Sequence, residues 1–223
     1  MSDRPARPFV VAIDGPAASG KGTLARRLAE RFRLAHLDSG KLYRATALVV
    51  LDGGGNPADQ ATAERAARRV DPAALADPRL LGEAVANASS IVAAIPAVRA
   101  ALLAMQRDFA AHPPGGAQGV VLDGRDIGTA VCPDAAVKLF ITASTRARAG
   151  RRLRELRQRG VAAIYRDVLQ DMKERDARDS GRRVAPLMAA PDAVTIDTTG
   201  LDANEVFEQA CDIIARALAA RGR

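Results

Sequence analysis

Short apolar runs alternate with longer amphipathic stretches along this chain of 223 residues. An apolar run of about five residues is typical of a strand buried on both faces, whereas apolar positions three and four apart predict a helix. Strands are predicted at 9–13, 119–122, 137–141 and 193–197, with a short apolar element at 35–37. Helices are predicted at about 24–32, 42–49, 59–70, 80–94, 96–111, 145–159 and 164–179, and after a capping box at 202–205. Strands that alternate with helices predict an α/β fold with a parallel sheet covered by helices on both faces.

A glycine-rich loop joins the first predicted strand to the first predicted helix. Its sequence, GPAASGKGT, contains the pattern G-x-x-x-x-G-K. Backbone N–H groups, the positive end of the helix dipole and a mobile lysine together bind phosphate oxygens in such a loop. The alternative is a tight turn without a ligand. The residues predicted to hold the phosphates of ATP are Gly15, Pro16, Ala17, Ala18, Ser19, Gly20, Lys21, Gly22 and Thr23.

Three charged residues follow the strand predicted at 119–122, in the sequence DGRDIG. An acid at the carboxyl end of a buried strand, downstream of a phosphate loop, is where a carboxylate that organises Mg²⁺ belongs. Asp123 is therefore a predicted magnesium ligand, with a turn stabilised by salt bridges as the alternative. Thr23 is the second predicted ligand, directly or through water, because Gly22 occupies the position where a hydroxyl usually follows the lysine.

Two segments rich in glycine and proline, which interrupt helices and strands, divide the chain. They are GGGNP at 53–57 and HPPGG at 112–116, and the stretch between them has the sequence pattern of helices and no strand-like alternation. We predict a single domain with a core at 8–52, 117–159 and 184–223, an acceptor-binding insert at 53–116 and a lid region at 160–183.

The net charge of +7 is concentrated in one segment. Residues 146–183 contain 12 Arg and 1 Lys against 6 acids, which leaves 20 bases and 20 acids elsewhere. Such a segment suits a mobile cover over polyphosphate, a nucleic-acid patch or a solvated helix face. Aromatic residues amount to only 3%, so stacking platforms for single strands are scarce. Neither Cys132 nor Cys211 has metal-binding spacing, and no apolar stretch is long enough to span a bilayer. We expect a cytoplasmic monomer that binds neither nucleic acid nor membrane.

One face of the helix predicted at 164–179 is apolar at its start and charged toward and just beyond its end. Its residues are spaced 4, 3, 4 and 3 apart, and they are Val168, Met172, Arg175, Asp179 and Arg182. The apolar end is predicted to pack on the core and the charged end to face a charged ligand. An Arg175–Asp179 pair at i, i+4 is the alternative.

A second phosphate contact is predicted where DSGKLYRA opens a helix. The helix start offers N–H donors, and Arg44 lies one turn in, beside Tyr43.

Six motifs occur in an order that resembles the bacterial cytidylate kinase family: GPAASGKGT, DSGKLYRA, NASSIVAAIPAVR, DGRDIGT, KERDARDSGR and VAPL. The resemblance implies a P-loop kinase fold and ATP-dependent phosphorylation of CMP and dCMP with Mg²⁺. It implies catalytic roles for Lys21, Arg125, Asp126, Arg175 and Arg182. It places Ser39, Tyr43, Arg44, Ser89, Arg99, Arg125, Asp126, Arg175, Asp179 and Arg182 around the acceptor, with Ser89 and Arg99 reading the cytosine. Members of the family often carry a β-rich insertion before NAS, which 70–87 lacks.

Other activities compete with this interpretation. A kinase of UMP, AMP or a small metabolite would share the phosphate loop, as would a nucleic-acid-binding P-loop protein. A regulatory GTPase should carry N-K-x-D, and no Asn in this chain is followed by Lys. Because an acceptor phosphate is already ionised, no general base is required, and His36 and His112 are expected to be structural or surface residues.

Overall fold

The computed structural model describes residues 7–221. Within that part the strands are β1 (Phe9–Asp14), β2 (Ala35–Asp38), β3 (Gly119–Gly124), β4 (Val137–Thr142) and β5 (Val194–Asp197). The α-helices are α1 (Lys21–Phe32), α2 (Ser39–Asp52), α3 (Gln60–Ala67), α4 (Glu83–Val92), α5 (Pro96–Ala111), α6 (Thr145–Gln158), α7 (Tyr165–Ser180) and α8 (Ala203–Arg221). Shorter helices are η1 (Pro72–Ala76), η2 (Pro78–Leu81), η3 (Pro114–Gly116) and η4 (Ile127–Val131), of which η4 is a π-helix.

The chain divides into two compact units. The first runs to Leu37 and includes Arg107–Ser144 and the chain from Met188 onward, whereas the second consists of Asp38–Gln106 and Thr145–Leu187. Helices α2 and α6 thus belong to the second unit, together with the predicted lid and residues 53–106 of the predicted insert, whereas residues 107–116 of the insert belong to the first. The division into core, insert and lid stays a prediction.

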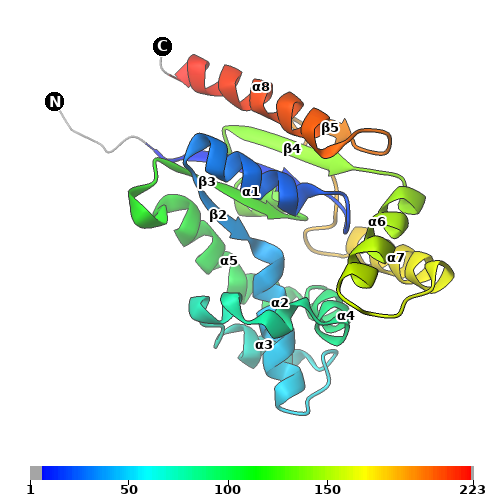
Figure 1. Ribbon diagram of the computed structural model, residues 1–223. Coiled ribbons are helices and arrows are strands. Elements are labelled where there is room, and N and C mark those ends of the chain that lie inside the picture. Colours follow the sequence, from blue (N-terminus) through cyan, green and yellow to red (C-terminus); the bar gives the residue numbers. More distant parts are fainter. Residues whose placement is uncertain (1–6, 222–223) are drawn as a thin grey trace. The chain divides into compact units, whose positions relative to one another are not determined.

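The strands form one sheet in the order β2-β3-β1-β4-β5. The pairs β1–β3, β1–β4 and β4–β5 are parallel. On one face of the sheet, α1 and α8 pack over alternate strand residues (Figure 1). This face buries Phe9, Val11, Ile13, Val121, Val137, Leu139, Ile141 and Ile196 against Leu24, Ala25, Leu28, Ala29, Val206, Ala210 and Ile214. Val10 on the opposite face lies against the end of α5 and the segment after η4. The predicted parallel sheet with helices on both faces is confirmed.

Local signals explain where the helices of the first unit begin and end. The N-cap of α1 is Gly20 with φ 93°, a conformation that glycine adopts without strain. At the start of α8, Asp202 Oδ1 accepts hydrogen bonds from the N–H groups of Asn204 and Glu205, and Glu205 bonds back to the N–H of Asp202 at 2.7 Å. The predicted capping box is therefore present.

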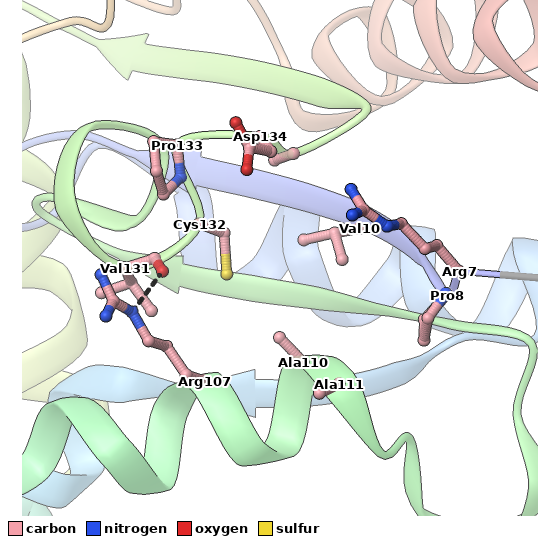
Figure 2. Close-up of a pocket in the computed structure, with 11 residues that line it drawn as sticks. Arg7, Pro8, Val10, Arg107, Ala110, Ala111, Val131, Cys132, Pro133 and Asp134 are labelled. Carbon is pink, nitrogen blue, oxygen red and sulfur yellow. Dashed lines mark hydrogen bonds between the residues drawn. The ribbon is translucent and has the colours of Figure 1, made fainter.

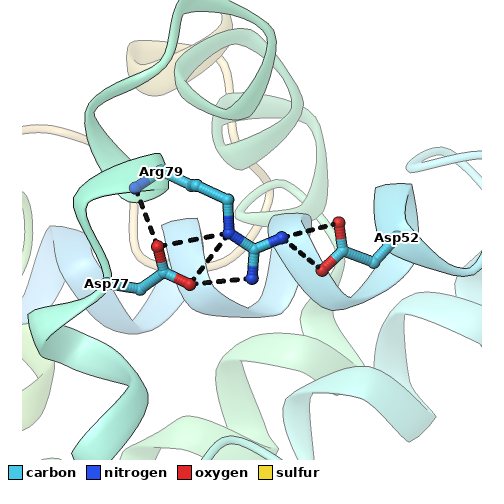
Figure 3. A network of polar contacts seen from close by, with 3 residues as sticks. All are labelled: Asp52, Asp77 and Arg79. Carbon is cyan, nitrogen blue, oxygen red and sulfur yellow. Dashed lines mark hydrogen bonds and ion pairs between the residues drawn. The ribbon is translucent and has the colours of Figure 1, made fainter.

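In the second unit, α2 packs against α3 and α4, and α6 packs against α7. The connection between α3 and α4 consists of two 3₁₀ turns, each capped by the aspartate that precedes a proline. Arg79 joins the second turn to the end of α2, because its guanidinium bonds the carboxylates of both Asp77 and Asp52 (Figure 3). The sequence predicted that residues 70–87 lack a β-rich insertion, and this segment contains the two turns and no strand.

Some predicted boundaries are wrong. The helix predicted at 80–94 begins at Glu83, because η2 ends before Gly82, which caps α4. Helix α7 ends at Ser180, so Arg182 lies beyond the helix to which its spacing assigned it. Strand β3 continues through Asp123 to Gly124, and the π-helix η4 had no sequence signal.

Among residues 7–221, no single helix has the length and apolar composition to cross a membrane, and α4 with the segment from Pro96 to Gly116 meets both criteria only as a pair bent by 100°.

Candidate active site

The phosphate loop lies between the carboxyl end of β1 and the start of α1. Gly15 has φ 151°, and a Cβ at this position would lie 2.0 Å from the carbonyl oxygen of Ile141, so no side chain fits. Thr198 at the end of β5 donates a hydrogen bond to the carbonyl oxygen of Ser19 at 3.2 Å. Lys21 Nζ lies 3.5 Å from the carbonyl oxygen of Pro16, within the loop itself. The loop is thus fixed by β4 and β5 and carries its lysine at the helix start, as phosphate binding requires.

Asp123 faces the first turn of α1. Its Oδ1 lies 3.9 Å from the point that a Cβ on Gly22 would occupy, and its carboxylate is almost fully buried. Asp123 Oδ2 lies 2.9 Å from His36 Nε2, on β2. The structural role expected for His36 stays a prediction, and its contact with the predicted metal ligand had no signal in the sequence.

The donor set near Asp123 fits Mg²⁺ in a nucleotide complex. Among residues 7–221, no cluster of three or more His, Cys, Asp or Glu side chains could hold a metal alone. Mg²⁺ bound with nucleotide typically uses one or two carboxylates, water and phosphate oxygens, so a single buried carboxylate beside a phosphate loop suits it. Thr23 is exposed on the same turn of α1, and its role as a ligand stays a prediction.

The segment DGRDIG also lies beside the phosphate loop. Asp14, the last residue of β1, accepts hydrogen bonds from the N–H groups of Ile127 and Gly128, both at 2.7 Å. Burial raises the pKa of Asp14 to about 6, because loss of solvation outweighs these two bonds. Arg125, half-buried, bonds the carbonyl oxygen of Gly124 at 3.2 Å, and Asp126 is 6% exposed.

In the second unit, α2, α4 and α5 contribute buried polar side chains. Arg99 donates to the carbonyl oxygen of Ala93 at 3.1 Å, and its guanidinium lies 5.3 Å from the centre of the Tyr43 ring. Arg44 donates to the carbonyl oxygen of Leu80 at 2.8 Å. Ser89 donates to the carbonyl oxygen of Ala86 at 2.7 Å, and Ser39 is 3% exposed. These backbone contacts hold the side chains in defined positions.

The end of α7 brings Asp179 and Arg182 into an ion pair with both side chains buried. Asp179 also accepts a backbone hydrogen bond from Leu187 at 2.9 Å, which folds the chain after the helix back toward it. Arg175 is half-buried on the same helix. Asp179 thus pairs with Arg182 at i+3.

A pocket of about 430 Å³ lies at the other end of β1 (Figure 2). Residues that line it include Arg7, Val10, Arg107 and Cys132. Burial raises the pKa of Cys132 to about 11, so its thiol is not a reactive nucleophile at neutral pH. The pocket opens near the amino end of the strand, away from the phosphate loop, and it holds none of the predicted site residues.

The structure therefore groups the predicted site residues by unit. The phosphate loop, Asp123, Arg125 and Asp126 lie in the first unit, and the second contains Ser39, Tyr43, Arg44, Ser89, Arg99, Arg175, Asp179 and Arg182. Sequence reasoning missed Asp14, for which the only available signal was an acid at the last position of a buried strand. His112 pairs with Asp108 on the surface, as expected.

A glycine-rich phosphate loop at the carboxyl end of the central strand of a parallel α/β sheet defines a P-loop nucleotide-binding protein. The family model described as "Cytidylate kinase" matches residues 11–216. The chain belongs to the cytidylate kinase family. It is therefore a kinase, and the fold class and the resemblance are confirmed.

Curated relatives match over nearly their whole length. A "Cytidylate kinase" of Rhodospirillum rubrum is 59% identical over 207 residues, which cover 93% of this chain and 97% of the relative. Another of Paramagnetospirillum magneticum is 58% identical over 92% of this chain and 97% of its own. A third, from Methylocella silvestris, is 55% identical over 94% of this chain and 95% of the relative.

Proposed function

We propose that this enzyme transfers the γ-phosphoryl group of ATP to CMP or dCMP, giving ADP and the pyrimidine diphosphate, by direct in-line displacement. The bond from the γ-phosphorus to the β,γ-bridging oxygen breaks as an oxygen of the acceptor phosphate bonds to phosphorus. That oxygen is already ionised at neutral pH, so catalysis consists of positioning and charge stabilisation. Membership of the family is the observation that carries the choice of acceptor.

The first unit holds the donor. Backbone N–H groups of Gly15–Thr23 bind the ATP phosphates, and Lys21 stabilises the charge that spreads over the moving phosphoryl group. Asp123, directly or through water, and Thr23 would hold Mg²⁺. Bound there, the ion would neutralise phosphate charge and orient the β- and γ-phosphate oxygens.

The acceptor roles that we propose are those that membership of the family implies. Arg125, Arg175 and Arg182 neutralise phosphate charge, with Ser39, Tyr43 and Arg44 at the phosphate end of the acceptor. Asp126 and Asp179 orient neighbouring donors and acceptor hydroxyls. Ser89 and Arg99 read the cytosine edge. The buried, backbone-bonded state of Ser89 and Arg99 supports this role, because a base-reading side chain needs a fixed position.

Release of ADP from ATP, measured across a panel of nucleoside monophosphates with and without Mg²⁺, tests this assignment. CMP and dCMP should be good substrates, UMP measurable but poor, and AMP and GMP negligible, since a purine exceeds a pyrimidine-sized slot. Turnover should require Mg²⁺. Faster turnover with UMP or AMP than with CMP would contradict the proposal.

We further propose that the enzyme acts in the cytoplasm as a monomer, with no nucleic-acid or membrane partner. A mobility-shift titration against salt tests the nucleic-acid part. Tight binding with a steep dependence on salt would show that the basic segment binds nucleic acid.

A further inference from the structure

Asp14 is a buried carboxylate that no step of the proposed reaction uses. It ends β1, immediately before the phosphate loop, and it is 3% exposed. Its Oδ1 accepts a hydrogen bond from the N–H of Ile127 and its Oδ2 accepts one from the N–H of Gly128, each at 2.7 Å. Both donors immediately follow the Arg125-Asp126 pair in the chain.

We propose that Asp14 is a positioning residue for the acceptor phosphate: its carboxylate fixes the backbone of Ile127 and Gly128 and thereby holds Arg125 and Asp126 beside the phosphate loop. The inference rests on the proposed roles of Arg125 and Asp126. Asp14 itself touches neither nucleotide.

The geometry requires an ionised carboxylate. Two N–H donors occupy both oxygens of Asp14, and only the ionised group accepts on both without presenting a donor of its own. A side chain at position 128 would have little room, since a Cβ there would lie 3.2 Å from Lys138 Cδ and 3.4 Å from Asp14 Oδ2. The carboxylate therefore fits closely around this turn of backbone.

The same segment is held independently at its other end, the carboxyl end of η4. There Arg107 of α5 donates to the carbonyl oxygen of Val131 at 3.1 Å (Figure 2) and to that of Ala130 at 3.0 Å. Of these two attachments, the contact with Asp14 is the one next to the Arg125-Asp126 pair. Loss of Asp14 should thus release the functional end of the segment while η4 stays attached.

Charged groups around Asp14 make this contact sensitive to pH. The pKa of Asp14 is raised to about 6, because desolvation and the charge of Asp126 raise it more than the two backbone bonds and Lys21 lower it. Lys138 of β4 packs its methylenes against Gly128, but its ammonium bonds Asp192 at 2.8 Å. Cys132, after η4, stays neutral because its pKa is about 11. The contact should weaken as pH falls through about 6.

The first test compares Asp14→Asn with Asp192→Asn, a matched change at an exposed carboxylate in the same unit. In Asp14→Asn the amide presents a donor to a backbone N–H, so kcat/KM for CMP should fall about 30-fold or more. The Kd of a non-hydrolysable ATP analogue should change less than about threefold, because the phosphate loop is intact. Asp192→Asn should leave both constants unchanged.

The second test observes the contact itself by NMR without nucleotide. The amide protons of Ile127 and Gly128 should titrate together with a midpoint near pH 6, in the wild-type enzyme and in Asp192→Asn. In Asp14→Asn, the chemical shifts of both amide protons should not change over this pH range. Gly128→Ala, which keeps every charge but adds a methyl group 3.2 Å from Lys138 Cδ and 3.4 Å from Asp14 Oδ2, should lower kcat/KM for CMP without changing the affinity for the ATP analogue.

The outcomes separate this inference from the proposed function. If Arg125→Ala impairs CMP phosphorylation while Asp14→Asn and Gly128→Ala stay within about threefold of wild type, the positioning role is wrong. If Arg125→Ala and Asp126→Asn are themselves fully active, the proposed site is wrong. Should Asp14→Asn fail to fold, an unimpaired Gly128→Ala together with wild-type amides that do not titrate would overturn the inference.

Discussion

A buried carboxylate at position 14 opposes folding when it is ionised. Its pKa is about 6 in the folded protein against an ordinary value of 3.8. Because the folded state binds this proton more tightly than the unfolded chain, the contribution of Asp14 to stability is greatest below pH 3.8 and declines as pH rises through 6. The shift of about two pKa units corresponds to roughly 3 kcal/mol at neutral pH. The enzyme tolerates this cost at the position where the proposed function needs a fixed backbone.

Asp14→Asn should change the pH dependence of stability in a defined direction. Between pH 5 and pH 7 only the wild type loses the stability that the proton on Asp14 contributes. The free energy of unfolding of Asp14→Asn minus that of wild type should therefore be about 1 kcal/mol more positive at pH 7 than at pH 5. Denaturant unfolding at the two pH values measures this change. Asp192→Asn is the control, since bonding to Lys138 lowers the pKa of Asp192 and it does not titrate in this window. A gap between wild type and Asp14→Asn that is constant with pH would contradict the raised pKa.

Lys21 supplies charge to the reaction rather than stability to the fold. Lys21→Met should leave circular dichroism and the melting temperature nearly unchanged and should lower turnover by about 10³-fold or more, through loss of a cation that stabilises the transition state. Lys173→Met, at an exposed lysine on α7, is the matched control and should be fully active. Retained turnover in Lys21→Met would remove the phosphate loop from the mechanism.

Arg99 is expected to select the base by the direction of its hydrogen bonds. A guanidinium can only donate, so Arg99 directed at N3 and O2 suits cytosine and meets the N3–H of uracil donor to donor. A buried mismatch of this kind costs on the order of 1–3 kcal/mol, which gives tens- to hundreds-fold selectivity. Arg99→Ala should therefore lower kcat/KM for CMP far more than for UMP.

The control for that prediction is Arg107→Ala on the same helix, whose arginine bonds backbone carbonyls after the π-helix. It should leave the ratio of CMP to UMP unchanged. If Arg99→Ala lowers both substrates by the same factor, Arg99 supports the fold or the phosphate and does not read the base.

At the scale of elements, the sequence predicted what depends on local patterns. The bounds of α5, the end of α1 at Phe32 and the capping box of α8 all follow from spacing and cap chemistry. The π-helix η4 does not, because its start is held by Asp14, a residue more than a hundred positions earlier in the chain. Arg182 was placed on α7 by its spacing, which carries no information about the end of the helix at Ser180. Which residues would serve the site was thus suggested by motifs, whereas their partners required the fold.

The contact between α6 and α7 contains a buried ion pair. Arg148, whose side chain is 4% exposed, bonds both carboxylate oxygens of Asp176 at 3.0 and 2.6 Å. Asp176→Ala should destabilise the protein by about 3 kcal/mol, because the guanidinium stays buried without its partner. The double variant Arg148→Met/Asp176→Leu should recover much of this loss, as measured by denaturant unfolding.

Glu64→Ala is the control, since it breaks the exposed pair with Arg68 and should change stability little. If Asp176→Ala is as mild as Glu64→Ala, water must reach the guanidinium and the pair does not stabilise the packing of α6 on α7.

Over the whole molecule, the excess positive charge is partly neutralised within the second unit. Besides the pair with Asp176, Arg152 pairs with Glu83 and Glu155, and Arg182 pairs with Asp179. Arg148 and Arg152 thus have carboxylate partners within the second unit, as has Arg182, for which we propose a phosphate-binding role. Residues 160–162 and Ile164 before α7, and Gly181 and Arg183 after it, are exposed parts of the lid region predicted at 160–183.

Those stretches make the lid prediction testable by limited proteolysis. Trypsin should cut the free enzyme after Arg159 and after Arg183, because exposed, loosely packed segments open most readily. A bisubstrate analogue that joins adenosine to cytidine through a polyphosphate should slow both cuts about tenfold or more, since arginines that otherwise repel one another gain an anionic partner. ATP or CMP alone should protect less. Cleavage after Arg69, at the end of α3, serves as the internal control and should keep its rate. Equal cutting after Arg159 and Arg183 with and without the analogue would show that residues 160–183 are a static part of the enzyme and not a lid.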